Sequence, residues 1–387
     1  MRGRKGLVDT AIFLGPTLAT AGGLYWISTG RAQGITPDVS VPFLLFVPWQ
    51  TLGITVVKCG VDSWILSRAS SWRGRTLILM PLVMRRYVPL AGAVGLLLAL
   101  RLPLVESIVA ALTALIDAIA LVLSNEMAAQ GRIRGSGAAN WLKYPLFFLA
   151  MVGLASLVHV SLELLLSAFL VTSALRLIAL LLMRPAGVTE GNERPHTVRL
   201  AAQQVLNYGL FKNDQLAVGI LNRGIQSTDA LFVYLARFPE LVSAVVTSVG
   251  PLLYPRLYPS KGASDFGARM TPTFFATATI VVIAAAVYGL TAGGTLSGRL
   301  WELLPAVTCH GLLVMPVNFR TYSLLREEHD RKLLFGLAGS NAIGTAIVAV
   351  AAVCFPRLPP DILWLTPLQQ VFFLWATRAA NPPANKT

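Results

Sequence analysis

Ionisable side chains lie within otherwise apolar stretches of this 387-residue chain. A charged group in hydrocarbon is costly, so such a side chain normally faces water, a partner or a ligand. A lysine or arginine in that setting can bind a phosphate or carboxylate group, and an aspartate can carry a proton or a cation. The basic candidates are Lys58, Arg176, Lys212 and Arg237, and the acidic candidates are Asp62, Asp117, Asp214 and Glu240.

The stretch 200–221 carries the densest group of polar residues. On a helix, Gln203, Asn207 and Asp214 fall within about 40° of one another. One side of this helix therefore cannot face lipid, and it either lines a hydrated cavity or makes a polar contact with another helix. Lys212 and Asp214 point in different directions and are not expected to pair. An adjoining stripe is formed by Gln204, Tyr208, Lys212 and Gln215.

The other charges have two interpretations each. Arg237 and Glu240 stand at i,i+3 and can pair across Pro239, either as a neutralised pair or as a cavity cation held by Glu240. Lys58 and Arg176 lie near the inner ends of their stretches, where a long side chain can also reach the interface.

Asp117 has no basic neighbour in the sequence. It is either a carboxylate that couples transport to H+ or Na+, or a hydrogen-bonded structural aspartate. Asp214 is a second candidate for the coupling ion. No cofactor is expected.

Metal and nucleotide chemistry is not supported by the sequence. Cys59, Cys309 and Cys354 are far apart, with no CxxC or Cys/His cluster, so no metal site is predicted. No GxxxxGK[ST] phosphate-binding loop occurs, which excludes an ATP-driven pump with its motor in the same chain.

The composition explains why these polar residues matter. Hydrophobic residues make up 55% of the chain and charged residues 13%, with a mean hydropathy of +0.65. Soluble domains carry about 45–50% apolar and about 25% charged residues. The chain is therefore predicted to be an all-α polytopic membrane protein, which also excludes a soluble enzyme, a disordered chain and a disulfide scaffold.

Apolar runs of about 20 residues are needed to cross the bilayer. Twelve runs are predicted to be transmembrane helices: 8–27, 41–65, 87–100, 104–123, 142–160, 162–182, 200–221, 230–254, 271–290, 301–318, 333–354 and 362–376. The first is expected to be a retained span and not a cleaved signal peptide, because Asp9 and Gly15-Pro16 interrupt it.

The basic residues give this topology an orientation. With a cytoplasmic amino terminus, 23 of the 32 Lys and Arg residues fall in inner segments and 5 in outer segments. Such a bias is typical of the positive-inside rule. It predicts twelve spans with both termini in the cytoplasm, in the cytoplasmic (inner) membrane, and it explains the net charge of +14 without nucleic-acid binding.

A polar linker divides the predicted spans into two sets of six. Residues 184–199 contain two prolines and two glycines and no apolar period. The predicted organisation is an amino-terminal lobe at 1–183, the linker at 184–199 and a carboxy-terminal lobe at 200–387. Two six-helix repeats favour a secondary transporter or flippase.

Several stretches resemble a known family. NYGLFKNDQLAVGIL (207–221) and STDALFVYLARFPELVSAVVTSVGPLLYPRLY (227–258) are similar to spans seven and eight of polysaccharide and O-antigen flippases. GVDSWILSRAS (60–70) is similar to the end of their second span. These flippases belong to the multidrug/oligosaccharidyl-lipid/polysaccharide exporter superfamily. The third run of about fourteen residues departs from that pattern.

The resemblance implies two six-helix lobes around a central cavity that opens alternately to each side. It also implies an isoprenoid lipid with a diphosphate-linked glycan as substrate. Lys212 and Arg237 would then recognise the anionic head, with Lys58 and Arg176 as further candidates, and Asp214, Asn207, Gln203 and Tyr208 would complete the cavity. The chain would be a monomer without enzymatic activity, in contact with membrane lipids, and polysaccharide polymerase or export components are further candidate partners.

Three alternatives remain open at the level of the sequence. A cation-coupled exporter of small amphipathic compounds would use Asp117 and Asp214. A membrane glycosyltransferase or ligase would need paired carboxylates in an outer loop, where the first loop offers only Asp38. A membrane scaffold that keeps the fold without transport is the third.

Overall fold

The structure, a computed structural model, describes a defined part of the chain. The described residues are 35–62, 75–76, 79–100, 103–130, 132–184, 188–189, 198–221, 227–239, 278–290, 299–326, 330–355 and 357–378, with isolated positions at 12, 15–16, 19–20, 22–23, 26–27, 65 and 275. Most of the predicted span 8–27, the part of 230–254 beyond residue 239, and Glu240 lie outside these residues.

The described residues are almost entirely helical. Among the described residues, six helices are long and apolar enough to cross a membrane, as expected for a polytopic membrane protein. They are Pro37–Lys58, Leu104–Ala129, Arg134–Ala155, Leu162–Met183, Leu300–Thr321 and Arg331–Cys354, and a shorter apolar helix spans Ala278–Leu290. The fold class is thus confirmed at this level, while the twelve-span count and the orientation stay predictions.

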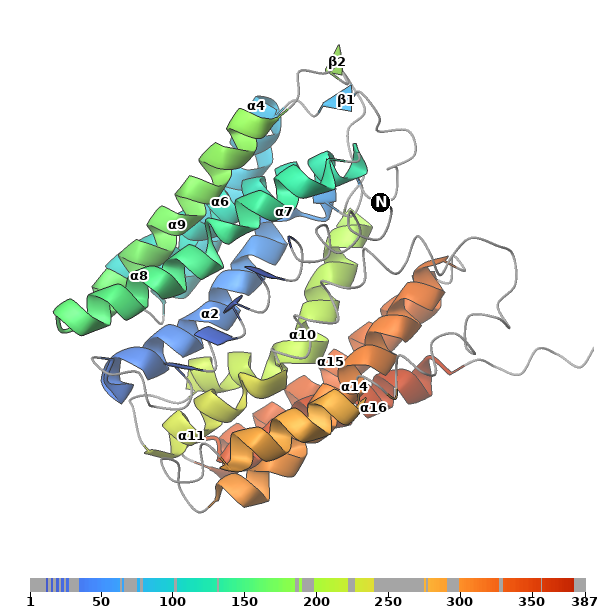
Figure 1. Cartoon of the computed structure of the whole chain (residues 1–387). Helices are drawn as coiled ribbons and strands as arrows, with labels where there is room; N and C mark the ends of the chain where they lie inside the picture. The colour runs from blue at the N-terminus through green and yellow to red at the C-terminus, as the bar shows by residue number, and fades with distance from the viewer. Residues whose placement is uncertain are drawn as a thin grey trace, which may run out of the picture. The chain divides into compact units, whose positions relative to one another are not determined.

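The chain divides into two compact units, Met1–Val205 and Leu206–Thr387. In the first unit α6 is central, because α2, α5, α7 and α9 all pack against it (Figure 1). The helices of this unit are α2 (Pro37–Lys58), α4 (Leu79–Leu82), the π-helix η1 (Val83–Tyr87), α5 (Val88–Ala99), α6 (Leu104–Ala129), α7 (Ile133–Trp141), α8 (Tyr144–Leu157) and α9 (Leu162–Met183).

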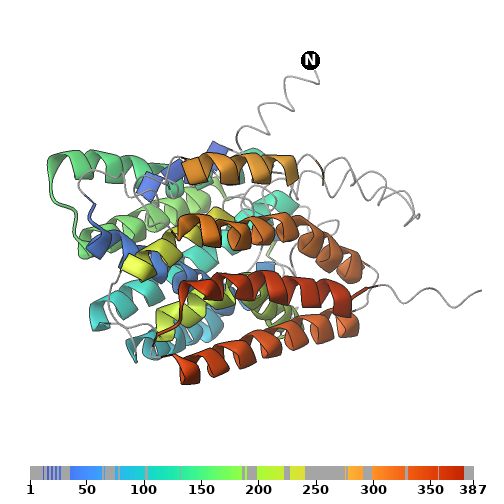
Figure 2. The ribbon, with the colours of Figure 1, turned by 90° about the horizontal axis from the view of Figure 1, so that it is seen from below.

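The second unit is built mainly on three helices near the carboxyl end of the chain. Here α16 packs against both α14 and α15 and lies between them (Figure 2). The elements are α11 (Ser227–Leu235), α14 (Leu300–Arg326), α15 (Asp330–Cys354), the 3-10 helix η2 (Pro360–Trp364) and α16 (Leu365–Ala376). Helix α10 (Val198–Leu221) begins within the first unit and ends within the second.

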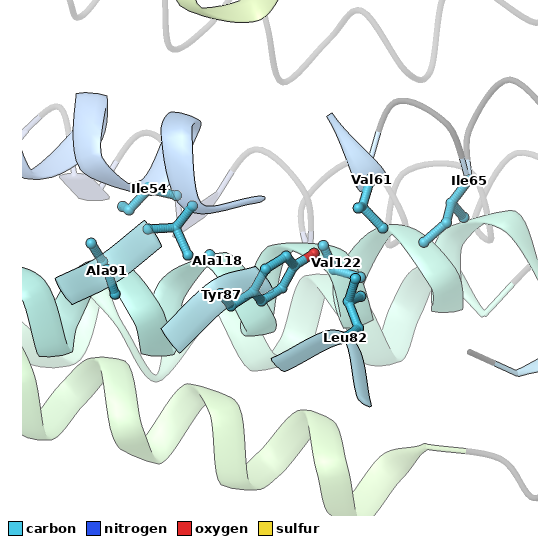
Figure 3. Close-up of a cluster of buried hydrophobic side chains, with 10 residues drawn as sticks. Ile54, Val61, Ile65, Leu82, Tyr87, Ala91, Ala118 and Val122 are labelled. Carbon is cyan, nitrogen blue, oxygen red and sulfur yellow. The ribbon is translucent and has the colours of Figure 1, made fainter. Parts of the chain in front are cut away.

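The apolar core of the first unit surrounds Tyr87. Tyr87 belongs to a cluster of buried side chains that includes Ile54 of α2, Ala91 of α5 and Val122 of α6 (Figure 3). The Tyr87 side chain is buried, and its hydroxyl donates a hydrogen bond of 3.5 Å to the carbonyl oxygen of Lys58. The ring therefore fills the core while its polar end is paired, as buried tyrosines require.

The third predicted span is longer than the sequence indicated. Helix α5 continues backwards through η1 and α4, which gives an unbroken helical stretch from Leu79 to Ala99. Arg85 and Arg86 had been assigned to an inner loop, but they lie in the π-helical turn, Arg85 exposed and Arg86 half-buried. A helix end near the interface tolerates arginines whose long stems reach the headgroups.

The fifth predicted span begins earlier than the expected 142–160. A single candidate span covers Arg134–Ala155 and consists of α7 and α8, separated by a turn at Leu142 and Lys143. Pro145, in the first turn of α8, has no N–H to donate to the turn before it, and this favours the interruption. Small and polar residues keep the hydropathy of α7 low, which is why the sequence placed it in a loop.

The second predicted span, 41–65, is interrupted by a turn at Cys59 and Gly60. Helix α2 stops at Lys58, and Cys59 and Gly60 follow with positive φ values of 47° and 71°. A Cβ atom on Gly60 would lie 2.8 Å from the Ala201 nitrogen, so the start of α10 packs directly on this turn. Both the dihedral angle and the close approach require glycine there.

A short strand pair joins two segments that the predicted topology places on the inner side. β1 (Arg75–Thr76) and β2 (Val188–Thr189) are parallel, with Arg75 opposite Val188. The sequence did not predict this contact, because two residues are too few to show a strand periodicity.

Candidate functional site

Asp117 lies about halfway along α6 and is completely buried. Its Oδ2 atom accepts a hydrogen bond from the Lys143 ammonium group. The same oxygen accepts a hydrogen bond of 3.0 Å from Gln50 Nε2 and one of 3.3 Å from Ser173 Oγ. Residues of α2 and α9 and the turn between α7 and α8 thus converge on one carboxylate of α6.

Arg176 of α9 completes this group of charges, which we call the Asp117 cluster: Asp117, Lys143, Arg176, Gln50 and Ser173. The Arg176 Nη1 atom lies 3.9 Å from Asp117 Oδ1, beyond hydrogen-bonding distance. Both Asp117 Oδ1 and Arg176 Nε are buried without a hydrogen-bond partner. The cluster therefore holds two cations and one anion, with hydrogen-bonding capacity still unused.

Aromatic rings form one wall of the Asp117 cluster. The Lys143 ammonium group lies 4.5 Å from the ring centroid of Tyr144 and 4.8 Å from that of Phe169. These distances allow cation–π attraction, which is strongest where water is excluded. Phe147 and Phe43 extend the wall, with ring centroids 5.5 Å apart. The lysine is therefore held between a carboxylate and apolar rings.

Lys143 is one of the basic residues that the predicted topology counts in the inner segments, and the structure places it within a candidate span. Lys143 is 1% exposed and lies inside the candidate span Arg134–Ala155. It is therefore a buried basic residue beyond the four candidates that the sequence indicated. The polar run at 131–143 hid it, although an isolated lysine directly before an apolar run with Pro145 was a usable signal.

The structure brings Asp117 and Arg176 together, although the sequence had offered them for different roles. Arg176 was a candidate for the substrate and Asp117 for the coupling ion. Because the two lie in one group with Lys143, any ligand or proton that reaches one affects the others electrostatically.

A second polar group lies where α2 ends. Lys58 Nζ is 2.7 Å from Asp62 Oδ2, across the Cys59–Gly60 turn. Gln204 of α10 donates a hydrogen bond of 3.0 Å to Asp62 Oδ1. Lys58 is thus paired next to the Cys59–Gly60 turn, and the polar stripe of α10 makes a helix contact here.

The second unit has its own buried charges, Asp214 and Arg237, each 1% exposed. Lys212 and Arg237 are the charged neighbours of Asp214, and the backbone N–H of Gln215 donates to Asp214 Oδ1 at 2.8 Å. Arg237 lies in the turn that ends α11, and the Gln215 side chain donates to the carbonyl oxygen of Ala236 in that turn. Asp214 and Arg237 are therefore electrostatic neighbours.

The remaining predicted residues lie along α10. Gln203 is buried, and Asn207, Tyr208 and Lys212 are half-buried. On the predicted polar side of this helix, Gln203 and Asp214 are thus buried and Asn207 is half-buried. A nearby amide contact was missed: Asn213 donates to Asn341 Oδ1 of α15 at 3.1 Å.

Metal binding finds no support in the described residues, where no group of three His, Cys, Asp or Glu side chains converges. Cys59, Cys309 and Cys354 are not joined by disulfide bonds.

Comparisons with known proteins assign no family. The chain matches no protein-family model, and it matches no curated protein sequence. The chemistry of the Asp117 cluster and of the Asp214–Arg237 neighbours is therefore the basis for any functional proposal.

Proposed function

We propose that the chain is a membrane transporter and not an enzyme. One observation carries the proposal: a charged cluster stands halfway along α6, beside an interruption in the candidate span that contributes Lys143. Secondary transporters commonly place substrate and ion sites at the middle of the membrane, at interrupted helices. A purely structural bundle gains little from burying two cations around one carboxylate.

The cargo we propose is a lipid-linked oligosaccharide or polysaccharide repeat unit, flipped across the cytoplasmic membrane by alternating access of two lobes. Within the Asp117 cluster two basic groups, Lys143 and Arg176, surround one carboxylate, and this local excess of positive charge favours an anionic head such as a diphosphate. Lys143, Arg176 and Arg237 are the buried cations that support this choice. The amides of Gln203 and Asn207 and the hydroxyl of Tyr208 suit sugar hydroxyl groups.

Reconstitution tests this function directly. The purified chain is placed in vesicles that contain a fluorescent lipid-linked oligosaccharide, and movement between leaflets is measured with an impermeant quencher. We expect faster movement than in protein-free vesicles, and a loss of at least tenfold in Arg176→Gln and Arg237→Gln. Arg299→Gln is the matched control, because Arg299 is exposed and outside the candidate spans.

If the wild-type chain does not accelerate the movement of this lipid, the flippase proposal is wrong. Equal rates in wild type, Arg176→Gln and Arg237→Gln would remove the assigned residues from the function.

A cation-coupled exporter of small amphipathic compounds is the second candidate. It is favoured by two fully buried carboxylates, Asp117 and Asp214. Uptake of a fluorescent cationic dye into inverted vesicles, driven by an imposed Na+ or H+ gradient, separates the two functions. An exporter moves the dye and leaves the lipid-linked oligosaccharide in place.

A further inference from the structure

The contacts of Asp117 define which cation the carboxylate can accept. Its partners Lys143, Gln50 and Ser173 donate hydrogen bonds to Oδ2, and Arg176 faces Oδ1. Na+ and other hard metal ions require several oxygen acceptors. A metal ion here would meet an ammonium and a guanidinium group at short range, whereas a proton needs only a lone pair of the carboxylate.

The helices that pack against α6 offer no second acid to the cluster within the described residues. α5 has no titratable residue, and the acids of α2 and α9, Asp38 and Glu163, belong to the first turns of those helices. On α6 itself, Glu106 stands in the first turn and Glu126 is paired with Arg184 at 3.1 Å. The other titratable groups on packed elements are Lys58, Arg85, Arg86, Tyr87, Arg134 and Tyr144.

The positive charge of the Asp117 cluster is therefore compensated only in part. Asp117 Oδ2 has three donors, while Oδ1 and the Arg176 Nε atom have no hydrogen-bond partner. An anion that accepts hydrogen bonds from Arg176 would satisfy donors that the carboxylate leaves unused. The planar fork of a guanidinium group suits the oxygens of a phosphate.

Lys143 is placed where its side chain can change partners. It lies in the turn between α7 and α8, with a backbone ψ of −88° outside the helical range. A side chain on such a turn can move without unwinding a helix, and helix interruptions of this kind serve ion and substrate sites in transporters.

We propose that Asp117 takes up a proton when the anionic phosphate group of a ligand binds to Lys143 and Arg176. The proton adds to a carboxylate oxygen of Asp117, the ion pair with Lys143 breaks, and a phosphate oxygen becomes the new acceptor. The proton and the anion then bind together, and each raises the affinity for the other. This inference rests on the proposed transport function, because it assigns H+ as the coupling ion.

The test measures protons taken up on binding by the full chain in lipid nanodiscs. The probe is farnesyl diphosphate, and calorimetric titrations at one pH in two buffers of different ionisation enthalpy give the number of protons. We expect the wild type to take up about one proton more than Asp117→Asn, since the variant corrects for ionisation of the probe. Lowering the pH by one unit should raise wild-type affinity up to about tenfold relative to the variant.

Glu126→Gln is the matched control for this measurement. Glu126 is a buried carboxylate on the same helix and is paired with Arg184, away from the Asp117 cluster. We expect it to take up as many protons as the wild type. If Asp117→Asn fails to fold, the double variant Asp117→Asn with Lys143→Met replaces it, because the double variant leaves one buried cation fewer.

Two further ligands identify the source of the anion. Binding of inorganic diphosphate with the same proton uptake means that the phosphate alone is recognised, and binding of farnesyl diphosphate alone means that the lipid is also required. Equal proton uptake in the wild type and in Asp117→Asn overturns the inference, as does equal uptake with uncharged farnesol. If the chain flips the lipid but takes up no proton on binding, this inference is wrong and the transport proposal stands. If it takes up a proton on binding but does not flip the lipid, the transport proposal is wrong and the proton-linked binding stands.

Discussion

Asp117 is the residue on which the interior of the first unit depends. Taking two charges out of water is costly, so a buried ion pair adds little net stability, but removing one partner leaves the other uncompensated. Because Lys143 and Arg176 both lie at the carboxylate, removing the charge of Asp117 should change the stability differently from removing the charge of Lys143 or of Arg176.

We expect Asp117→Asn to destabilise the chain by about 3–5 kcal/mol, because it leaves two buried cations without a counter-ion. Lys143→Met should cost less, since Asp117 and Arg176 remain as a balanced pair. Adding Lys143→Met to Asp117→Asn should recover part of the lost stability. Thermal unfolding in one detergent measures all three, and additive losses would contradict the shared-carboxylate geometry.

Gly60 provides a residue-scale test of the turn after α2. Gly60→Ala should destabilise the chain by at least about 1–2 kcal/mol, the cost of a left-handed backbone for a residue with a Cβ atom, and the close Ala201 nitrogen adds to it. Gly92→Ala in α5 is the control, because its Cβ atom would meet nothing within 4 Å. An unfolding midpoint in Gly60→Ala equal to that of the control would argue against this turn.

At the scale of elements, α15 meets α16 through a row of small residues. Gly336, Ser340 and Gly344 are four residues apart and share one face, and the Ser340 carbonyl oxygen accepts a 2.9 Å hydrogen bond from Gln369. Small residues at this spacing allow two membrane helices to approach closely.

Gly344→Ala tests this row. Its Cβ atom would overlap Gln369 Nε2, so α16 must shift or the hydrogen bond from Gln369 to Ser340 must break. We expect a loss of about 1–3 kcal/mol, typical of overpacking. Gly339→Ala should cost less, because its Cβ atom would lie 3.2 Å from the Phe372 ring, which can adjust. The reverse order of unfolding midpoints would contradict the packing of α15 on α16.

Helix periodicity and hydropathy predicted the apolar elements well, and they failed where a helix is buried by small or polar residues. α9 matches the run at 162–182 closely, and α6 begins with the run at 104–123 but continues to Ala129. α7 escaped prediction because Gly135 and Ser136 pack against α6, where hydropathy carries no signal. The π-helical turn at η1 also has no sequence signature.

At the scale of the whole molecule, the orientation in the membrane remains to be measured. Arg299 and Asp361 belong to two segments that are predicted to be outside, and their side chains form an ion pair of 3.1 Å. Arg320 and Thr377 belong to two segments that are predicted to be inside, and Arg320 donates a hydrogen bond of 2.8 Å to the Thr377 carbonyl oxygen. This grouping fits the predicted alternation, because residues assigned to one side contact each other.

Cysteine labelling measures the orientation in intact cells. With the native Cys59, Cys309 and Cys354 changed to serine, Asp361→Cys should react with an impermeant maleimide from outside. Lys332→Cys should react only after the membrane is permeabilised. Labelling of Lys332→Cys alone in intact cells would mean that the orientation is the reverse of the predicted one. Labelling of both positions in intact cells would reject the predicted topology.

The sequence could predict which charged residues belong to the candidate sites, but it could not predict which of them contact each other. Asp117 and Arg176 were visible as charges in apolar runs, yet their meeting depends on how α6 and α9 pack, which no spacing within one helix reveals. Lys58 and Asp62 were predictable as a pair because both lie within one turn of chain.

The position of α10 determines where the chain can be divided into two co-expressed fragments. Its first turns belong to the unit that ends at Val205, where Ala201 packs on Gly60 and Gln204 binds Asp62. A half-chain that stops in the polar linker at 184–197 would lose these contacts, whereas one that stops after Leu221 would retain them. Co-expressed fragments should therefore associate and function when they overlap across α10, and the linker, although it is the obvious break in the sequence, is the poorer place to divide the protein.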